Sequence, residues 1–164
     1  KTLLNEEFRI VNLEEDMKEE NFTIIHIASH GKFGNEAKDS FVLTYDKKLT
    51  MDRLGELIGL FQFRRIPLDL LTLSACETAA GDERSALGLA GVAVKAGARS
   101  ALATLWFISD QASSNLINQF YIRLKAGSLS KAQALREAQV TLLDHPIYRH
   151  PGYWAPFLLI NNWL

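Results

Sequence analysis

The segment Leu68–Leu73, with the sequence LDLLTL, is followed directly by Ser74-Ala75-Cys76 and then by a polar, glycine-containing stretch. A short apolar run of this kind predicts a strand that is buried on both faces of a sheet. Two other runs have the same character, Thr23–Ala28 (TIIHIA) and Ser100–Leu105 (SALATL). The first of these ends at Ser29-His30-Gly31. Continuously apolar strands are typical of parallel sheets whose two faces are covered by helices.

Amphipathic helical patterns alternate with these strands. They cover a segment that ends near Glu20, a segment that follows Thr50, the segment Ser85–Ala96 and two segments in the last third of the chain. Thr50 predicts a helix N-cap, and Gly97 and Gly127 predict helix ends. The alternation predicts an α/β sandwich with a mostly parallel sheet.

The connecting segments are assigned from their polarity. We expect Lys32–Ser40 to be a loop, Phe41–Tyr45 a short strand and Asp46–Lys48 a turn. The Arg64–Arg65 pair predicts a solvated helix end. Trp154–Ile160 predicts a last strand, which Pro156 restricts to an edge of the sheet.

Length and composition exclude several classes of protein. The chain has 164 residues, of which 48% are hydrophobic and 23% charged, and these values are ordinary for one globular domain. A formal net charge of -1 without a basic block gives no electrostatic support for nucleic-acid binding. No apolar run of about 18 residues predicts a membrane span.

Cys76 is the single cysteine of the chain. It has no partner for an internal disulfide, and a lone thiol fits a reducing, cytoplasmic compartment. The chain starts at Lys1 without methionine. We therefore expect residues 1–164 to be a single domain and a C-terminal fragment of a longer protein.

Two residues with catalytic chemistry follow predicted strands. His30 comes after Thr23–Ala28, and Cys76 comes after Leu68–Leu73. Sites in open parallel sheets form beyond the carboxyl ends of the strands, so neighbouring strands would bring a base and a thiol together. A nearby imidazolium favours the thiolate, which is the nucleophilic form. Gly31 has no Cβ and allows close approach, so its N–H and that of Cys76 are candidates for an oxyanion hole.

Each of these residues also has a purely structural interpretation. A lone cysteine is more often a small core residue, and a lone histidine is more often an ordinary loop residue. The position at the strand ends weighs toward catalysis for both. His26, inside a predicted strand, is interpreted as a hydrogen-bonded core residue. No cluster of Cys, His and carboxylate residues has metal-ligand spacing, so the sequence predicts no metal site.

Three stretches resemble the CHAT domain, a caspase-like module related to separases. They are Ile24–Gly31 (IIHIASHG), Leu70–Gly81 (LLTLSACETAAG) and Ala96–Asp110 (AGARSALATLWFISD). The tail Tyr153–Ile160 (YWAPFLLI) resembles the closing strand of the family, and the similarity covers nearly all of Phe22–Leu164. The resemblance implies a caspase/haemoglobinase-like three-layer sandwich with a mostly parallel central sheet flanked by helices. It also implies that the first strand of this sheet can precede Lys1.

The resemblance also implies roles for individual residues. His30 is the catalytic histidine and Cys76 the nucleophile of a cysteine endopeptidase, with Gly31 and the Cys76 N–H as the oxyanion hole. Asp110 stands where separases use an aspartate to bind a basic side chain before the scissile bond. Ser74 stands where caspases that cut after aspartate have glutamine, which argues against acidic substrates. An equal alternative for Asp110 is the N-cap of the helix that follows it.

Partners follow from the resemblance as well. CHAT domains often sit behind tetratricopeptide repeats that bind a partner and control the peptidase. We therefore expect a protein or peptide substrate and upstream repeats or a regulatory partner, and no cofactor, nucleic acid or membrane.

One alternative is a catalytically silent interaction or signalling module on the same fold, in which the His30–Cys76 pair has no catalytic role. A receiver-like or flavodoxin-like domain would need an acidic pocket or a phosphate loop after its first strand, and Thr23–Gly31 supplies neither.

Overall fold

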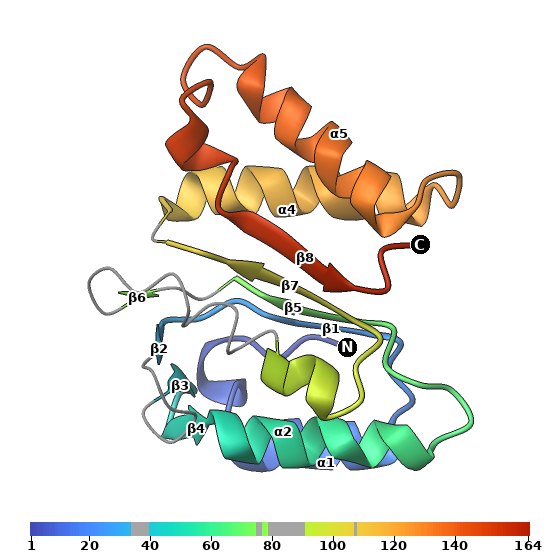
Figure 1. Cartoon of the computed structure of the whole chain (residues 1–164). Coiled ribbons are helices and arrows are strands. Elements are labelled where there is room, and N and C mark those ends of the chain that lie inside the picture. Colours follow the sequence, from blue (N-terminus) through green and yellow to red (C-terminus); the bar gives the residue numbers. More distant parts are fainter. Residues whose placement is uncertain (34–39, 75–76, 79–90, 107) are drawn as a thin grey trace.

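The computed structural model of the chain describes residues 1–33, 40–74, 77–78, 91–106 and 108–164 (Figure 1). Its centre is a sheet with the strand order β1-β5-β7-β8. Three strands run parallel, β1 (Ile24–Ile27), β5 (Leu70–Leu73) and β7 (Ser100–Thr104). The last strand, β8 (Phe157–Asn161), pairs antiparallel with β7. The predicted mostly parallel sheet is therefore confirmed.

Helices cover both faces of this sheet (Figure 1). One face carries α1 (Ile10–Glu19), α2 (Met51–Gly59) and a helical stretch over residues 91–95. The other face carries α4 (Asp110–Lys125) and α5 (Lys131–Leu143). Short 3-10 segments lie at Asn5–Glu7, Leu60–Phe63 and Pro151–Tyr153. This is the predicted three-layer α/β sandwich. Positions 85–90 of the predicted helix Ser85–Ala96 lie outside the described residues.

The helix boundaries follow their capping chemistry. The Thr50 hydroxyl accepts a hydrogen bond from the Arg53 N–H, as predicted for the start of α2. Gly97 and Gly127 have φ values of 113° and 73°, in the left-handed region that glycine adopts at helix ends. A Cβ at Gly97 would also overlap the Gln62 side chain, so two constraints require glycine there.

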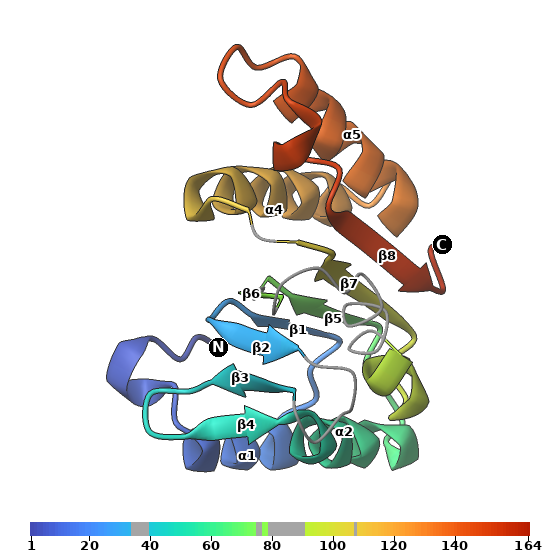
Figure 2. The same cartoon turned by 60° about the vertical axis from the view of Figure 1, so that its left-hand side comes forward.

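A second, smaller sheet lies beside the first, with the strand order β4-β3-β2-β6 (Figure 2). Its strands are β2 (Gly31–Phe33), β3 (Phe41–Leu43), β4 (Lys48–Thr50) and β6 (Glu77–Thr78). The prediction of a loop over Lys32–Ser40 is therefore wrong at its start, where β2 pairs with β3. The strand β4 had no counterpart in the prediction, because three residues are too few to show a period of two.

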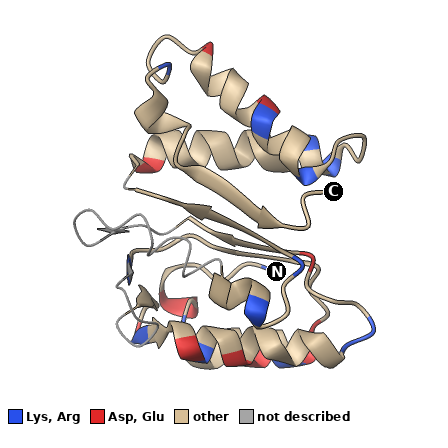
Figure 3. Cartoon of the chain, viewed as in Figure 1, with Lys and Arg blue, Asp and Glu red and all other residues tan. Residues whose placement is uncertain are grey.

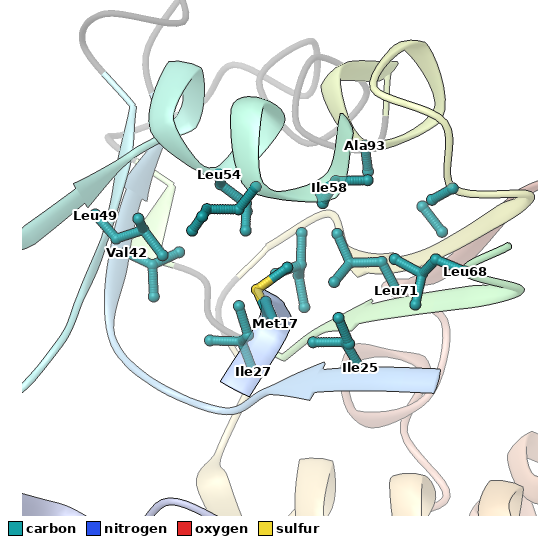
Figure 4. Close-up of a cluster of buried hydrophobic side chains, with 14 of the residues drawn as sticks. Met17, Ile25, Ile27, Val42, Leu49, Leu54, Ile58, Leu68, Leu71 and Ala93 are labelled. Atoms are coloured by element: carbon teal, nitrogen blue, oxygen red, sulfur yellow. The ribbon is translucent and has the colours of Figure 1, made fainter. Parts of the chain in front are cut away.

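Two hydrophobic clusters fill the space between the sheet and the helices. The first lies against α1 and α2 and includes Met17, Leu54 and Leu71 (Figure 4). The second lies against α4 and α5 and includes Phe120. Successive residues of a strand point to opposite faces, so Leu70 joins the second cluster while its neighbour Leu71 joins the first.

The edge strand β1 differs from the prediction that it is buried on both faces. Ile25 and Ile27 are buried in the first cluster, whereas His26 is exposed and Ile24 is 38% exposed. His26 and Ile24 are exposed because β1 is the edge strand among the described strands of the central sheet. The second cluster takes described residues from β5, β7 and β8, but it takes none from β1.

Charged residues lie outside the central sheet, whose strands read IIHI, LLTL, SALAT and FLLIN. In the described part of the chain, basic and acidic residues are interspersed on the helices and connections (Figure 3). Arg53, for example, binds both Glu14 and Glu56, each at 2.6 Å. Among the helices that the structure describes, none combines the length and apolar character that crossing a membrane requires.

Arg64 is a structural residue, and the prediction of a solvated helix end is wrong for its side chain. Its guanidinium donates to the carbonyl groups of Met17 (2.6 Å), Lys18 (2.7 Å) and Glu20, at the end of α1. It also lies 4.5 Å from the centre of the Phe61 ring. Carbonyl groups in the last turn of a helix have no partner within the helix, and Arg64 satisfies them.

We expect Arg64→Ala to lower the free energy of unfolding by about 1–3 kcal/mol, because several carbonyl acceptors lose a charged donor. Urea unfolding followed by circular dichroism measures this change. Arg65→Ala is the matched control, since Arg65 is exposed, and it should change stability by less than about 0.5 kcal/mol. Equal stabilities of the two variants would contradict the capping role.

Candidate active site

A groove of about 580 Å³ opens at the carboxyl ends of the parallel strands, beside the start of α4. Ile108 and Ile117 give it apolar surface, and Tyr121 of α4 lines it as well. The polar groups along it are His26, Ser29, His30, Ser74, Thr104, Asp110, Ser113, Ser114 and Asn118. Open parallel sheets place ligand sites at this edge because the connections diverge there.

Three of the predicted site residues meet in this groove, although they are far apart in sequence. His30 follows β1, Ser74 follows β5 and Asp110 begins α4. The strands β1 and β5 are direct neighbours in parallel register, with Ile27 opposite Leu73. The nucleophile candidate, Cys76, lies outside the described residues.

The structure describes residues before and after Cys76, and these contact residues that come before and after His30. Before it, the Ser74 N–H donates to the Ile27 carbonyl at 3.1 Å. After it, β6 pairs in parallel with β2, and Glu77 lies opposite Lys32. His30 lies between β1 and β2, and Cys76 lies between β5 and β6 in the sequence. Since β1 pairs with β5 and β2 pairs with β6, the two connections begin and end at paired strands.

Gly31 is the buried first residue of β2 and lies opposite Val42 of β3. The Leu43 N–H donates to the His30 carbonyl at 2.7 Å. In an antiparallel ladder this bond makes Gly31 and Val42 a non-hydrogen-bonded pair. The Gly31 N–H is consequently directed away from β3.

Asp110 lies in the first turn of α4, but it does not cap the helix. Ser109 is the N-cap, because its hydroxyl accepts a hydrogen bond from the Ala112 N–H at 3.3 Å. The alternative interpretation of Asp110 as the N-cap is therefore wrong by one residue. Among the described residues that line the groove, Asp110 is the one Asp, Glu, Lys or Arg, and so it sets the sign of the local charge.

His26 belongs to the groove, and its interpretation as a core residue is wrong. Its Nε2 lies 2.7 Å from the Ser74 Oγ, and its ring lies 5.6 Å from the ring of Tyr121. His26 has an exposed edge, but the walls of the groove desolvate its ring and so lower its pKa below the ordinary value, which favours the neutral imidazole at pH 7. Strand alternation was the signal in the sequence, since a residue between Ile25 and Ile27 faces away from their cluster.

Tyr121 is held in turn by the sheet. Its hydroxyl donates to the Thr72 Oγ1 at 2.8 Å, and Thr72 lies opposite His26 in the register of β1 and β5. Burial raises the pKa of Tyr121. Tyr121, Thr72, His26 and Ser74 thus form a connected wall contributed by α4, β5 and β1.

A second hollow of about 540 Å³ continues along β1 and shares His26, Ala28 and Tyr121 with the groove. Residues from Lys1 to Phe22 supply much of its remaining lining. Among the described residues, no three His, Cys, Asp or Glu side chains lie close enough together to hold a metal ion.

This three-layer sandwich with a mostly parallel sheet is consistent with the caspase-like class of α/β proteins. The CHAT domain family matches residues 1–162, and the chain belongs to this family. Over 67 residues, the chain is 37% identical to human (Homo sapiens) tetratricopeptide repeat protein 28. That match covers 41% of this chain and 3% of the length of the human protein.

Proposed function

We propose that this chain is a cysteine endopeptidase domain that uses His30 and Cys76. The Cys76 thiolate attacks the carbonyl carbon of a peptide bond and forms a C–S bond. His30 gives a proton to the leaving amine as the C–N bond breaks, which leaves a thioester. Water, deprotonated by His30, then hydrolyses the thioester to a carboxylic acid and regenerates the thiol.

The paired strands on both sides of the two residues carry this proposal. Ser74 is bonded to β1 next to His30, and Glu77 pairs with β2 just after it. A connection of two residues, 75 and 76, joins these fixed points on the Cys76 side. The residues that flank Cys76 are therefore bonded to the residues that flank His30, and this supports the proposed pair.

Gly31 supports the same chemistry. Its N–H is directed away from β3 and lies next to His30 in the chain. In the proposal this N–H and that of Cys76 stabilise the oxyanion of the tetrahedral intermediate. Removing one such donor costs roughly 2.7–4 kcal/mol of barrier height in peptidases.

The preferred substrate in this proposal has arginine or lysine before the cut. Asp110 gives the groove a carboxylate, and the Ser74 hydroxyl adds a neutral acceptor. A cationic side chain is complementary to both groups. The adjoining hollow along β1 gives room for further residues of an extended peptide.

Regulation by tetratricopeptide repeats is part of the proposal and is supported by the similarity to human tetratricopeptide repeat protein 28. Repeat arrays present extended concave surfaces for partner binding. A partner bound by such repeats would control access to the groove. We also propose a cytoplasmic location, on the basis of the lone thiol.

We expect the intact protein to cleave fluorogenic peptides that end in arginine or lysine, and to cleave those that end in aspartate more slowly. Cys76→Ala should reduce the cleavage to background, because alanine has no nucleophile. Equal turnover by the wild type and Cys76→Ala would contradict the catalytic proposal. Faster cleavage after aspartate would contradict the proposed specificity only.

A further inference from the structure

Ser74 is held by β1 through both its backbone and its side chain. Its N–H donates to the Ile27 carbonyl at 3.1 Å, and its Oγ lies 2.7 Å from the His26 Nε2. The His26 ring is in turn packed against Tyr121, which is bonded to Thr72. The Ser74 hydroxyl therefore has a defined direction, and three structural elements fix it.

The chemistry of this pair sets what the hydroxyl offers to a ligand. A serine hydroxyl has one proton and two lone pairs, and a neutral imidazole has one acceptor nitrogen. When the His26 Nε2 accepts the Ser74 proton, both lone pairs of the Oγ remain for the groove. The groove also contains the Asp110 carboxylate, and it contains no Lys or Arg among its described lining residues.

We infer that His26 is a positioning residue, which holds Ser74 as an acceptor so that the groove binds an alkyl guanidinium or ammonium group between Ser74 and Asp110. This inference rests on the site of the proposed function and adds to it the residue that sets its specificity. A guanidinium carries five N–H donors and suits a hydroxyl and a carboxylate together.

Acidification should weaken this binding. Protonated His26 can no longer accept from Ser74, and it places a positive charge beside the ligand. Desolvation lowers the pKa of His26, so this loss takes place at a pH below the one at which an ordinary histidine titrates. Other titratable or charged groups around His26 are His30, Asp110 and Tyr121 in the groove and Lys1 and Asp16 in the adjoining hollow. A variant that cannot titrate at position 26 separates its effect from theirs.

The test measures binding of agmatine, an alkyl guanidinium, to the intact protein with Cys76→Ala, by ligand-observed NMR titration. Butylurea is the neutral comparison ligand. At pH 7.5, His26→Leu and Ser74→Ala should each weaken agmatine binding about tenfold, and the double variant should be no weaker than either single one. His26→Gln, whose amide oxygen can accept from Ser74, should retain the affinity and should lose less of it between pH 7.5 and 5.5 than the parent does.

Several results would overturn the inference. Unchanged agmatine affinity in His26→Leu is one, and an equal loss for agmatine and butylurea is another, since that loss would indicate a general distortion. If His26→Leu fails to fold, Ser74→Ala and the pH response of His26→Gln decide the question. A separate outcome tests the proposed function. If the protein binds agmatine but shows no peptide cleavage that requires Cys76, the peptidase proposal is rejected and the cation site is retained.

Discussion

His30→Ala is expected to lower kcat for peptide cleavage by about 10²–10⁴-fold, the usual contribution of a general acid–base residue. His30 lines the groove, and its neighbours Ile27 and Lys32 are paired with the chain on either side of Cys76. In the proposed mechanism, the variant loses the group that helps to ionise the thiol and that protonates the leaving amine. KM should change little, because His30 is not assigned to substrate binding.

The control for this prediction is His145→Ala. His145 stacks on Tyr148 at 4.8 Å and is not among the residues that line the groove. Its kcat should equal that of the wild type. Alkylation of the single thiol by iodoacetamide gives a second readout, and it should be slower in His30→Ala than in His145→Ala. A His30→Ala variant with wild-type kcat would reject the catalytic pair.

Phe120→Ala should lower the free energy of unfolding by about 3–5 kcal/mol. Phe120 is fully buried in the cluster beneath α4 and α5, and its removal leaves a cavity as well as lost apolar contacts. Domains are stable by only about 5–15 kcal/mol, so this change is a large part of the total. Urea unfolding, followed by both fluorescence and circular dichroism, gives the change and checks that the transition is two-state.

Ile122→Ala tests whether position within α4 decides this effect. Ile122 lies on the same helix two residues later and is 55% exposed, whereas Phe120 is 0% exposed. The Ile122 variant should lose less than about 0.5 kcal/mol. Similar losses in the two variants would mean that helix propensity, and not burial, controls the stability of this layer.

The order and type of the main elements were predictable because local patterns determine them. Leu70–Leu73 is buried at every position, as its unbroken apolar run predicted. The similar run in β1 was misread, because the sequence of a strand does not state whether helices cover both of its faces. Whether helices cover both faces depends on the position of the strand in the sheet, and long-range packing determines that position.

The candidate site was predictable to a smaller extent. The strand-end rule selected His30 and Cys76, and the family resemblance selected Ser74 and Asp110. The groove brings His30, Ser74 and Asp110 together. His26 was missed because an apolar context suggested a core position. The N-cap of α4 is Ser109, one residue before Asp110, which was the predicted alternative. An error of one residue is within the usual uncertainty of helix boundaries. The register of β2 with β6 depends on tertiary structure and has no local sequence signal.

Successive residues along β1 alternate between exposed and buried positions. Ile25 and Ile27 are buried in the first hydrophobic cluster, while His26 and the residue just after the strand, Ala28, line the groove. We therefore expect exchange of His26 or Ala28 to change the surface of the groove with little loss of folding energy, and exchange of Ile25 or Ile27 to lower the stability of the fold. A single short strand thus contributes one set of side chains to the groove and another set to the packing that holds the fold together.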